Sequence, residues 1–311
     1  YISYSKSDLK SICTGCVCAA VTAPSGLLRR YILESIGYYN GTFAPPEELM
    51  IPALDRGYYF GDGVYEALRV ENHVPFELEA HLDRLEHSLA ALKINFSMPR
   101  DTLRGILAEV CRRVESETQL LYFQITRGTG PRSHSFDAAA RPNLLVFARH
   151  SPLADVETPK KATFVPDIRW SRCDLKTINL LPSVLAAQQA AERGCSEAIF
   201  ERDGVVSECA SANLFLLKGG ELRTAPADRR ILAGVTRARL ILLADELGVP
   251  VSQEAFSVRD ALAADELIVT STSVHCASIG EIDQTPVGGK DPALLKKLQA
   301  AFRAYFRSAV G

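Results

Sequence analysis

A proline- and acid-containing stretch, SPLADVETPK at residues 151–160, divides this 311-residue chain into two parts with different hydrophobic patterns. Such composition is typical of a linker between domains, and a chain of this length can hold two of them. We therefore predict a smaller N-terminal domain at residues 38–150, the linker at 151–160 and a larger C-terminal domain at 161–311. Residues 1–37 precede them as an extension without an evident role.

The first part combines strand and helix signals. The segment GVYEALRVENHVPF predicts a β-hairpin, with a strand at Val64–Val70, a turn at Glu71-Asn72 and a second strand from His73 to Phe76. Leucines at helical spacing from 78 to 92 predict a helix, and a second helix opens at residue 99. The segments LLYFQITRG and NLLVFARH predict two more strands, joined by the polar loop TGPRSHSFDAAARP. We expect helices packed on an antiparallel sheet.

The second part alternates strands with helices. KATFVPDIRW, EAIFERDG, NLFLLKGG and DELIVTST predict strands, while residues 182–193, 235–247 and 292 onward predict helices. With 47% hydrophobic residues the chain can bury a large core, which excludes extended disorder. The whole pattern predicts an α+β fold.

Charge and cysteine content narrow the function classes. The net charge is −2 without a long run of one sign, so the electrostatic footprint of a nucleic-acid binder is missing. A small-molecule partner is the better expectation. Eight scattered cysteines do not form a disulfide framework, which favours a reducing, cytoplasmic compartment.

The first 36 residues leave other interpretations open. Their apolar run from Ile12 to Ala23 is too short to span a bilayer, so no membrane is expected, although it would suit the apolar part of a secretory signal. Cys13, Cys16 and Cys18 are candidate metal ligands, but no fourth ligand lies close by in the sequence. The simpler hypothesis is a loosely attached extension and no metal site.

Lys176 is the candidate reactive residue of the segment DIRWSRCDLKTINLLPSVLAAQQAAERG. A lysine that attacks a carbonyl to form a Schiff base must be shielded from water, because desolvation lowers the pKa of its amine. Its apolar neighbours Leu175, Ile178 and Leu180 suit such shielding. The alternative is a lysine at a strand end that extends its amine to the surface.

Two segments could together bind an anion. Gly234 and Thr236 stand at the start of a predicted helix, where free backbone amides and the helix dipole attract a phosphate. Thr270–Ser273 add a hydroxyl-rich turn after a strand. The alternatives are that Thr236 only caps its helix and that the hydroxyls serve ordinary turn chemistry.

Glu208 is a single carboxylate among small and apolar residues, followed by Asn213. A buried carboxylate needs a partner, and a protonated pyridine nitrogen would be one. A nearby arginine is the alternative.

Seven segments in this order resemble the fold-type IV pyridoxal-phosphate aminotransferases, and among them the D-amino-acid aminotransferases. They are DRGYYFGDGVYEALRV, AHLDRL, RGTGPRSH, CDLKTINLLPSVLAAQQA, VSECASANLF, ILAGVTR and ELIVTSTS, and the resemblance runs from about residue 38 to the end of the chain. It implies a two-domain α+β fold, with an N-terminal α/β sandwich and a C-terminal pseudo-barrel with helices.

The resemblance also implies roles for these residues with pyridoxal 5'-phosphate as cofactor. Lys176 would form the Schiff base with the cofactor and then move a proton between the substrate and the cofactor. Glu208 would pair with the pyridine nitrogen, and Leu232 would pack on the ring face. The phosphate would be held by Arg84, Thr236, Ser271, Thr272 and the backbone amide of Val235, and the cofactor-binding set further includes Ser211, Asn213 and Gly234.

Substrate recognition follows from the same resemblance. Arg132 and His134, in the pattern Arg-x-His, would bind the substrate carboxylate together with Tyr65, because a guanidinium fork meets a carboxylate with two hydrogen bonds. The arginine and histidine would come from the neighbouring subunit, so a homodimer is implied. From the residues alone, the loop could equally be polar and without a ligand.

Several other histidines and cysteines are predicted to be surface or packing residues. His73, His81 and His87 are expected on the surface of a helix or hairpin. Cys173 and Cys209 lie next to candidate site segments but lack the histidine partner of a catalytic thiol, so both are expected to be packing residues.

The resulting hypothesis is a reversible ping-pong transfer of the amino group from D-alanine and other D-amino acids to 2-oxoglutarate, giving pyruvate and D-glutamate. Three alternatives remain. They are a branched-chain L-amino-acid aminotransferase, an aminodeoxychorismate lyase of the same fold, and a non-catalytic protein that retains the cofactor.

Overall fold

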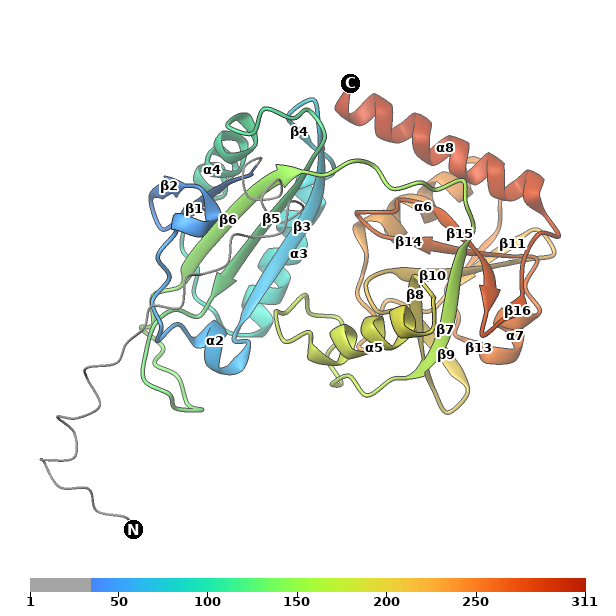
Figure 1. Cartoon of the computed structure of the whole chain (residues 1–311), viewed down its shortest axis with the longest axis horizontal. Helices are drawn as coiled ribbons and strands as arrows, with labels where there is room; N and C mark the ends of the chain where they lie inside the picture. The colour runs from blue at the N-terminus through green and yellow to red at the C-terminus, as the bar shows by residue number, and fades with distance from the viewer. Residues whose placement is uncertain (1–34) are drawn as a thin grey trace, which may run out of the picture.

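The computed structural model describes residues 35–311. The apolar run and the three cysteines singled out in the first 36 residues therefore lie outside the described part of the chain. Within it, the chain forms two sheets with their helices, joined by residues 151–159, which belong to no helix or strand (Figure 1).

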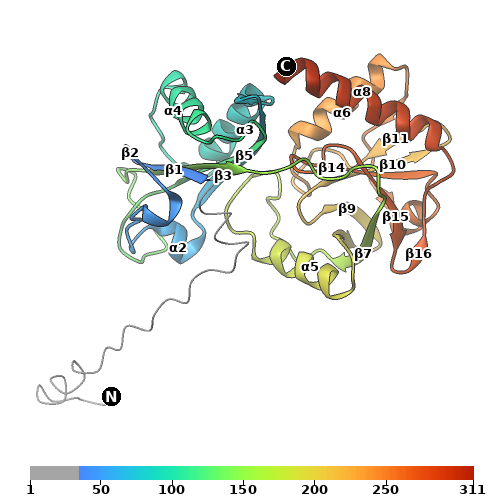
Figure 2. The ribbon, with the colours of Figure 1, turned by 45° about the horizontal axis from the view of Figure 1, so that its top comes forward.

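The N-terminal sheet of the described chain is antiparallel throughout, in the order β2-β1-β6-β5-β3-β4. Its strands are β1 (Ser35–Tyr39), β2 (Thr42–Ala44), β3 (Gly63–Glu71), β4 (Val74–Pro75), β5 (Gln119–Thr126) and β6 (Asn143–His150). The helices α3 (Leu78–Ala91) and α4 (Arg100–Arg112) cover one face (Figure 2). The leucines of α3 predicted from their spacing pack there on Leu68, Leu121 and Phe123. The short helices η1 (Pro46–Glu48) and α2 (Arg56–Phe60) lie between β2 and β3 in the chain.

The hairpin turn lies one residue later than predicted. Glu71 still pairs with Val74, and the two turn residues are Asn72 and His73, with φ of 50° and 61°. A two-residue turn with both residues in the left-handed region matches the twist of the flanking strands, which explains the shift.

The C-terminal sheet follows the order β12-β11-β10-β14-β15-β7-β8-β9-β13, with β16 beside β15. Its strands are β7 (Lys160–Pro166), β8 (Glu197–Arg202), β9 (Val205–Cys209), β10 (Asn213–Lys218), β11 (Glu221–Thr224), β12 (Val251–Ser252), β13 (Phe256–Ser257), β14 (Glu266–Thr270), β15 (Ala277–Ile282) and β16 (Thr285–Pro286). Its helices are α5 (Leu181–Glu192), α6 (Val235–Glu246), α7 (Val258–Leu262) and α8 (Pro292–Val310).

This second sheet is mixed and curls back on itself. The pairs β7–β8, β7–β15 and β11–β12 are parallel, and the other pairs are antiparallel. The backbone amide of Cys209, at the end of β9, donates to the carbonyl of Ala212, just before β10, at 2.8 Å. The strands β9 and β10, which are far apart in the strand order, therefore lie close together. The predicted α+β fold with a pseudo-barrel is confirmed.

The two parts meet along β3. Val64 forms a bridge with Thr177, and the amide of Tyr65 donates to the carbonyl of Lys176 at 2.9 Å. The segment before α5 is thereby fixed against the first sheet, and this brings the candidate lysine next to residues of β3.

Candidate active site

A cavity of about 870 Å³ lies between the two parts of the chain. Its volume falls in the range of small-molecule and cofactor sites, which is roughly 300–1,000 Å³. Twelve of the fourteen predicted site residues line it: Tyr65, Arg84, Lys176, Glu208, Ser211, Asn213, Leu232, Gly234, Val235, Thr236, Ser271 and Thr272.

Lys176 is fixed by its backbone and half-buried. Its carbonyl accepts from Tyr65, and its amide donates to the hydroxyl of Ser88 at 3.3 Å. The Nζ atom lies 4.2 Å from the centroid of the Tyr65 ring, in the cavity wall. A lysine that extends from a strand end into solvent does not match this geometry.

Glu208 is almost fully buried, with 5% of its surface exposed. Its carboxylate accepts from Asn213 Nδ2 at 2.9 Å, from the amide of Leu232 at 3.2 Å and from Arg169 Nη1 at 2.5 Å. Burial raises the pKa of Glu208 to about 7, and Arg169 and Leu232 counteract part of this rise.

Arg169 is not among the predicted site residues, and it is the arginine that lies beside Glu208 in the structure. Its guanidinium is fixed by Asp167 at 2.9 Å, and it lines the same cavity. Although burial acts in the opposite direction, Asp167 and Glu208 raise the pKa of Arg169 above its usual range. The arginine therefore stays charged beside the carboxylate.

The start of α6 offers free backbone donors. Gly234 occupies the N-cap position and no side chain caps the helix, so Thr236 does not serve as the cap. Arg84 donates to the carbonyl of Ala233 at 3.0 Å, which brings its guanidinium beside this turn. Free amides, the helix dipole and a guanidinium together suit an anion.

The loop after β14 adds hydroxyl groups to the cavity wall. Thr272 donates to the carbonyl of Ala67 at 3.0 Å, and Ser271 lies 3.2 Å from Ser273, oxygen to oxygen. Thr270 is 1% exposed and lines the cavity, and its Oγ1 has no hydrogen-bond partner among the described residues. A buried hydroxyl without a partner indicates a position for a ligand or a bound water.

The surface prediction for His81 is wrong. It is 3% exposed, and its Nδ1 lies 2.7 Å from Glu66 Oε2. Glu66 faces inward on β3 and also accepts from Arg84 at 2.7 and 2.9 Å. Glu66 occurs at an inward position of the strand pattern, between apolar residues, and a buried carboxylate needs polar partners. The sequence could therefore have indicated that a polar residue of the covering helix, such as His81, points inward.

The contacts among Glu66, His81 and Arg84 determine the charge of each group. Burial alone would raise the pKa of Glu66, but Arg84 and His81 hold it at about 2. Burial lowers the pKa of His81, so its imidazole stays neutral near pH 7. The carboxylate thereby orients Arg84 toward the start of α6.

The other predicted surface and packing residues agree with the structure. His73 and His87 are exposed, and Cys209 is buried. Cys173 is half-buried and lines the cavity. Burial raises the pKa of its thiol to about 11, so the protonated form dominates at neutral pH.

Arg132 and His134 do not line the cavity of their own chain. Both are exposed on the loop between β5 and β6 and lie against Phe60, whose ring centroid is 5.5 Å from Arg132 Cζ and 5.3 Å from the His134 ring. Phe60 itself lines the cavity. The roles of Arg132 and His134 stay a prediction.

Among residues 35–311, no group of three or more His, Cys, Asp or Glu side chains is arranged to hold a metal ion. In the same range, no helix is long and apolar enough to cross a membrane.

Comparison with known proteins identifies the family. The family model for amino-transferase class IV matches residues 63–282. D-alanine aminotransferase of Staphylococcus haemolyticus is 34% identical over 275 residues, covering 87% of this chain and 98% of that protein. D-alanine aminotransferase of Bacillus licheniformis is 35% identical over 268 residues, covering 85% and 95%.

Among solved structures, the branched-chain amino acid aminotransferase from Escherichia coli is similar at a TM-score of 0.80 and 25% identity, covering 88% of this chain and 94% of that chain. A fold IV transaminase from Curtobacterium pusillum gives 0.72 and 25%, covering 85% and 93%. The predictions of the family and of aminotransferase activity are confirmed. The chain belongs to the class IV aminotransferases.

Proposed function

We propose that the protein transfers the amino group of D-alanine and other D-amino acids to 2-oxoglutarate, giving pyruvate and D-glutamate, with pyridoxal 5'-phosphate as cofactor. One observation carries the proposal: Lys176 and the buried carboxylate of Glu208 line the same cavity as the uncapped start of α6. The curated relatives named D-alanine aminotransferase support the choice of substrate.

The cavity fits the proposed cofactor. A Cβ atom added at Gly234 would lie 2.0 Å from Asn213 Oδ1, so only glycine lets this turn approach the asparagine so closely. The amides beyond Gly234 are uncapped, and the hydroxyl of Thr270 lacks a partner in the described chain. These are the features expected around a phosphorylated aromatic ring.

In this proposal, each predicted residue has a physical task. Glu208 would accept from the ring nitrogen, assisted by Asn213, and Leu232 would pack against the ring. The phosphate would be bound by Arg84, Thr236, Ser271, Thr272 and the amide of Val235, with Gly234 and Ser211 shaping the pocket. When bound, pyridoxal phosphate supplies an electron sink for the carbanion formed at the substrate's α carbon.

Lys176 is the proposed catalytic residue. Its primary amine would take the proton from the substrate's α carbon and return one during the reverse half-reaction. The hydrogen bonds of its amide and carbonyl fix the start of the side chain, while Tyr65 shields the Nζ atom on one side.

Substrate orientation is proposed to require a second subunit. Arg132 and His134 would reach the partner's cavity and bind the substrate carboxylate opposite Tyr65. In support, an exposed apolar patch borders the cavity, where Leu181 is 68% exposed and Val184 is 56% exposed. A second copy packed on this patch would bury it and bring the loops together.

The branched-chain L-aminotransferase remains the second candidate, because solved structures of that activity share the fold. The exposed pair Arg132 and His134 favours the D-specific reaction, as the resemblance implies. We also propose a cytoplasmic location, since the five cysteines of the described chain are all free.

The decisive experiment is a half-reaction without an amino acceptor. Protein loaded with pyridoxal phosphate would be mixed separately with D-alanine and L-leucine, while the visible absorbance of the bound cofactor is followed. Loss of this absorbance with D-alanine only, together with release of pyruvate, is expected. Loss with L-leucine only would replace the proposal by the branched-chain reaction.

Two variants complete this experiment. Lys176→Ala should abolish the half-reaction, whereas Lys296→Ala, which removes an exposed lysine of α8, should leave it unchanged. If Lys176→Ala retained the half-reaction, the assignment of the catalytic base would be wrong. If wild-type protein bound the cofactor but transformed neither amino acid, the non-catalytic alternative would gain support.

A further inference from the structure

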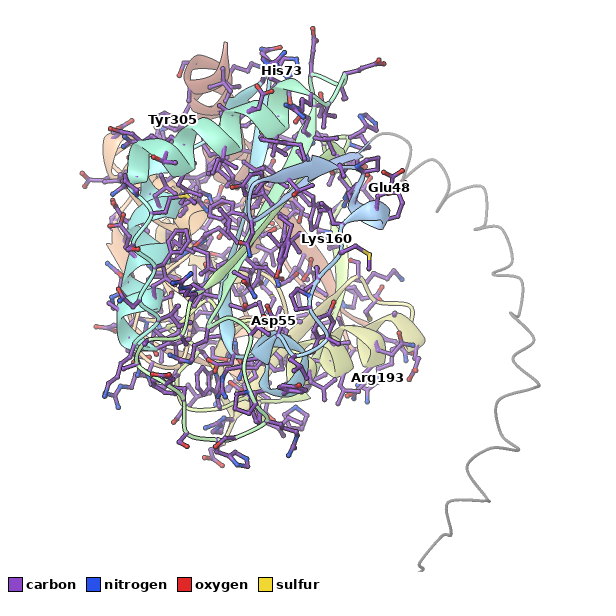
Figure 3. All side chains as sticks on the ribbon, turned by 90° about the vertical axis from the view of Figure 1, so that its left-hand side faces the viewer. Glu48, Asp55, His73, Lys160, Arg193 and Tyr305 are labelled. Atoms are coloured by element: carbon purple, nitrogen blue, oxygen red, sulfur yellow. The ribbon has the colours of Figure 1, made fainter. Side chains whose placement is uncertain are left out.

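A second cavity of about 360 Å³ lies at the junction of the two parts of the chain. It is formed by the β3–β4 turn, the connection at 151–159, the loop after β14 and α8. Figure 3 shows His73 of this turn and Tyr305 of α8 at the same end of the molecule. Among the described residues, none lines both this cavity and the candidate active site.

The walls of this second cavity are largely apolar. Phe302, Phe306 and Val310 of α8 form one side, and Leu153 and Val156 of the connection form another. Asn72 in the turn donates to the carbonyl of Val310 at 3.0 Å, which holds the two sides together. A cavity of this size suits a fragment-sized ligand with an apolar body.

A buried imidazole belongs to the wall of this cavity. His275 is 9% exposed, and its ring packs on Phe306 at 4.5 Å and Phe302 at 5.3 Å between centroids. Its Nε2 has no hydrogen-bond partner among the described residues. Burial and the charge of Arg69 lower the pKa of His275 to about 4, so the neutral ring can donate one hydrogen bond.

A buried guanidinium lies close enough to His275 for its charge to lower the pKa of the imidazole. Arg69 lies on the same face of β3 as Glu71, which lines the cavity, and it is only 2% exposed. Its Nε and Nη2 atoms have no hydrogen-bond partner in the described chain. Burial lowers the pKa of Arg69, and the nearby carboxylate of Glu71 counteracts part of this effect.

The charge around the cavity is positive on balance. Arg303 and Arg307 of α8 line it, and Arg303 is paired with Glu157 at 2.8 Å. Arg307 is exposed and has no ion pair among residues 35–311. The charged side chains that line the cavity are thus two arginines and the single carboxylate of Glu71, a balance that favours an anionic ligand.

We propose that this second cavity binds a small organic carboxylate with a compact aryl or branched aliphatic body. The carboxylate faces His275 and Arg307, and the apolar body packs between α8 and the connection. This site does not depend on the proposed transamination. Its wall includes the loop after β14, because the amide of His275 donates to the carbonyl of Ser271 at 2.9 Å.

The test uses para-fluorophenylacetate, which carries neither an amino nor an oxo group. Binding to protein saturated with pyridoxal phosphate would be followed by fluorine NMR, while the fluorescence of Trp170, the sole tryptophan of the chain, monitors the active-site cavity. We expect one saturable site and no change in the Trp170 signal. An unsaturable signal, or quenching of Trp170 in step with binding, would refute the second site.

Three variants and a control locate the site. Ala154→Phe adds bulk at an exposed position of the lining and should abolish binding. His275→Phe keeps the ring packing and should weaken binding by about tenfold, the equivalent of one hydrogen bond. Arg307→Ala should also weaken it, whereas Lys296→Ala, the same charge loss elsewhere on α8, should not.

Binding of the probe to the variants decides whether it occupies the second cavity. Binding that survives Ala154→Phe and His275→Phe without change would place the probe elsewhere and overturn the proposal. Thermal unfolding of each variant checks that the fold persists. The half-reaction with D-alanine is measured in parallel, so a failure of this proposal is distinct from a failure of the proposed transamination.

Discussion

Gly234→Ala is the sharpest structural test of the anion-binding turn. Gly234 has φ of −69°, which any residue adopts, so the backbone itself tolerates alanine. The new Cβ would lie 2.0 Å from Asn213 Oδ1 and 3.3 Å from Arg237 Cβ. The first contact is about 1.4 Å closer than ordinary van der Waals distance, so the side chain of Asn213 must move.

The displacement of Asn213 determines the magnitude of the effect. Its Nδ2 atom donates at 2.9 Å both to Glu208 and to the carbonyl of Leu232. A hydrogen bond to a charged group contributes about 1.5–3 kcal/mol. If the loss of this hydrogen bond weakens cofactor binding by the same free energy, affinity for pyridoxal phosphate should decrease roughly 10- to 150-fold.

The assay is a titration with pyridoxal phosphate, followed by the fluorescence of Trp170 in the cavity wall. Gly105→Ala is the control, because a Cβ there meets nothing within 4 Å and alanine favours the helix α4. The control should bind like the wild-type protein. Affinity of Gly234→Ala within twofold of wild type would refute the steric argument.

Three further predictions follow from single residues. Thr270→Val preserves shape but removes the unpaired hydroxyl, so cofactor affinity should fall about three- to tenfold by the same titration, with unchanged thermal stability. Glu66 has a pKa lowered from 4.5 to about 2, so its contribution of roughly 3 kcal/mol is present above pH 4.5 and is lost as the pH falls toward 2. Urea unfolding between pH 5 and 3 should therefore show a flatter pH dependence in Glu66→Gln. Arg169→Gln removes the cation beside Glu208 and should move the pH titration of the bound cofactor's absorbance, while Arg169→Lys should move it less. A titration unmoved in Arg169→Gln would show that this arginine has only a structural role.

Local signals in the sequence predicted the elements well, because spacing and turn residues act over short distances. The leucines of α3 and the proline before α4 marked helices that the structure contains at nearly those bounds. The turn at Asn72 and His73 was displaced by one residue, since strand pairing decides which residues are left for the turn. Boundaries of this kind depend on the partner strand.

Contacts between distant segments were harder to predict. His81 was expected on the surface, yet Glu66 lies 15 residues away on the strand that α3 covers and draws the imidazole inward. Helix periodicity identifies the inward face but not which polar residue of the sheet lies beneath it. The pairing of Arg169 with Glu208, separated by 39 residues, likewise depends on strand order, because β7 and β9 both pair with β8.

Glu208 can accept hydrogen bonds from an arginine and from a ring nitrogen at the same time. A carboxylate offers roughly four acceptor positions. In the described chain, three groups donate to it: Arg169, Asn213 and the amide of Leu232. One position therefore remains for a further donor on the cavity side. The arginine favours the ionised carboxylate despite its burial, and only an ionised carboxylate can hold a ring nitrogen protonated. Arg169 is thus better understood as a support for the proposed cofactor contact than as a competitor for Glu208.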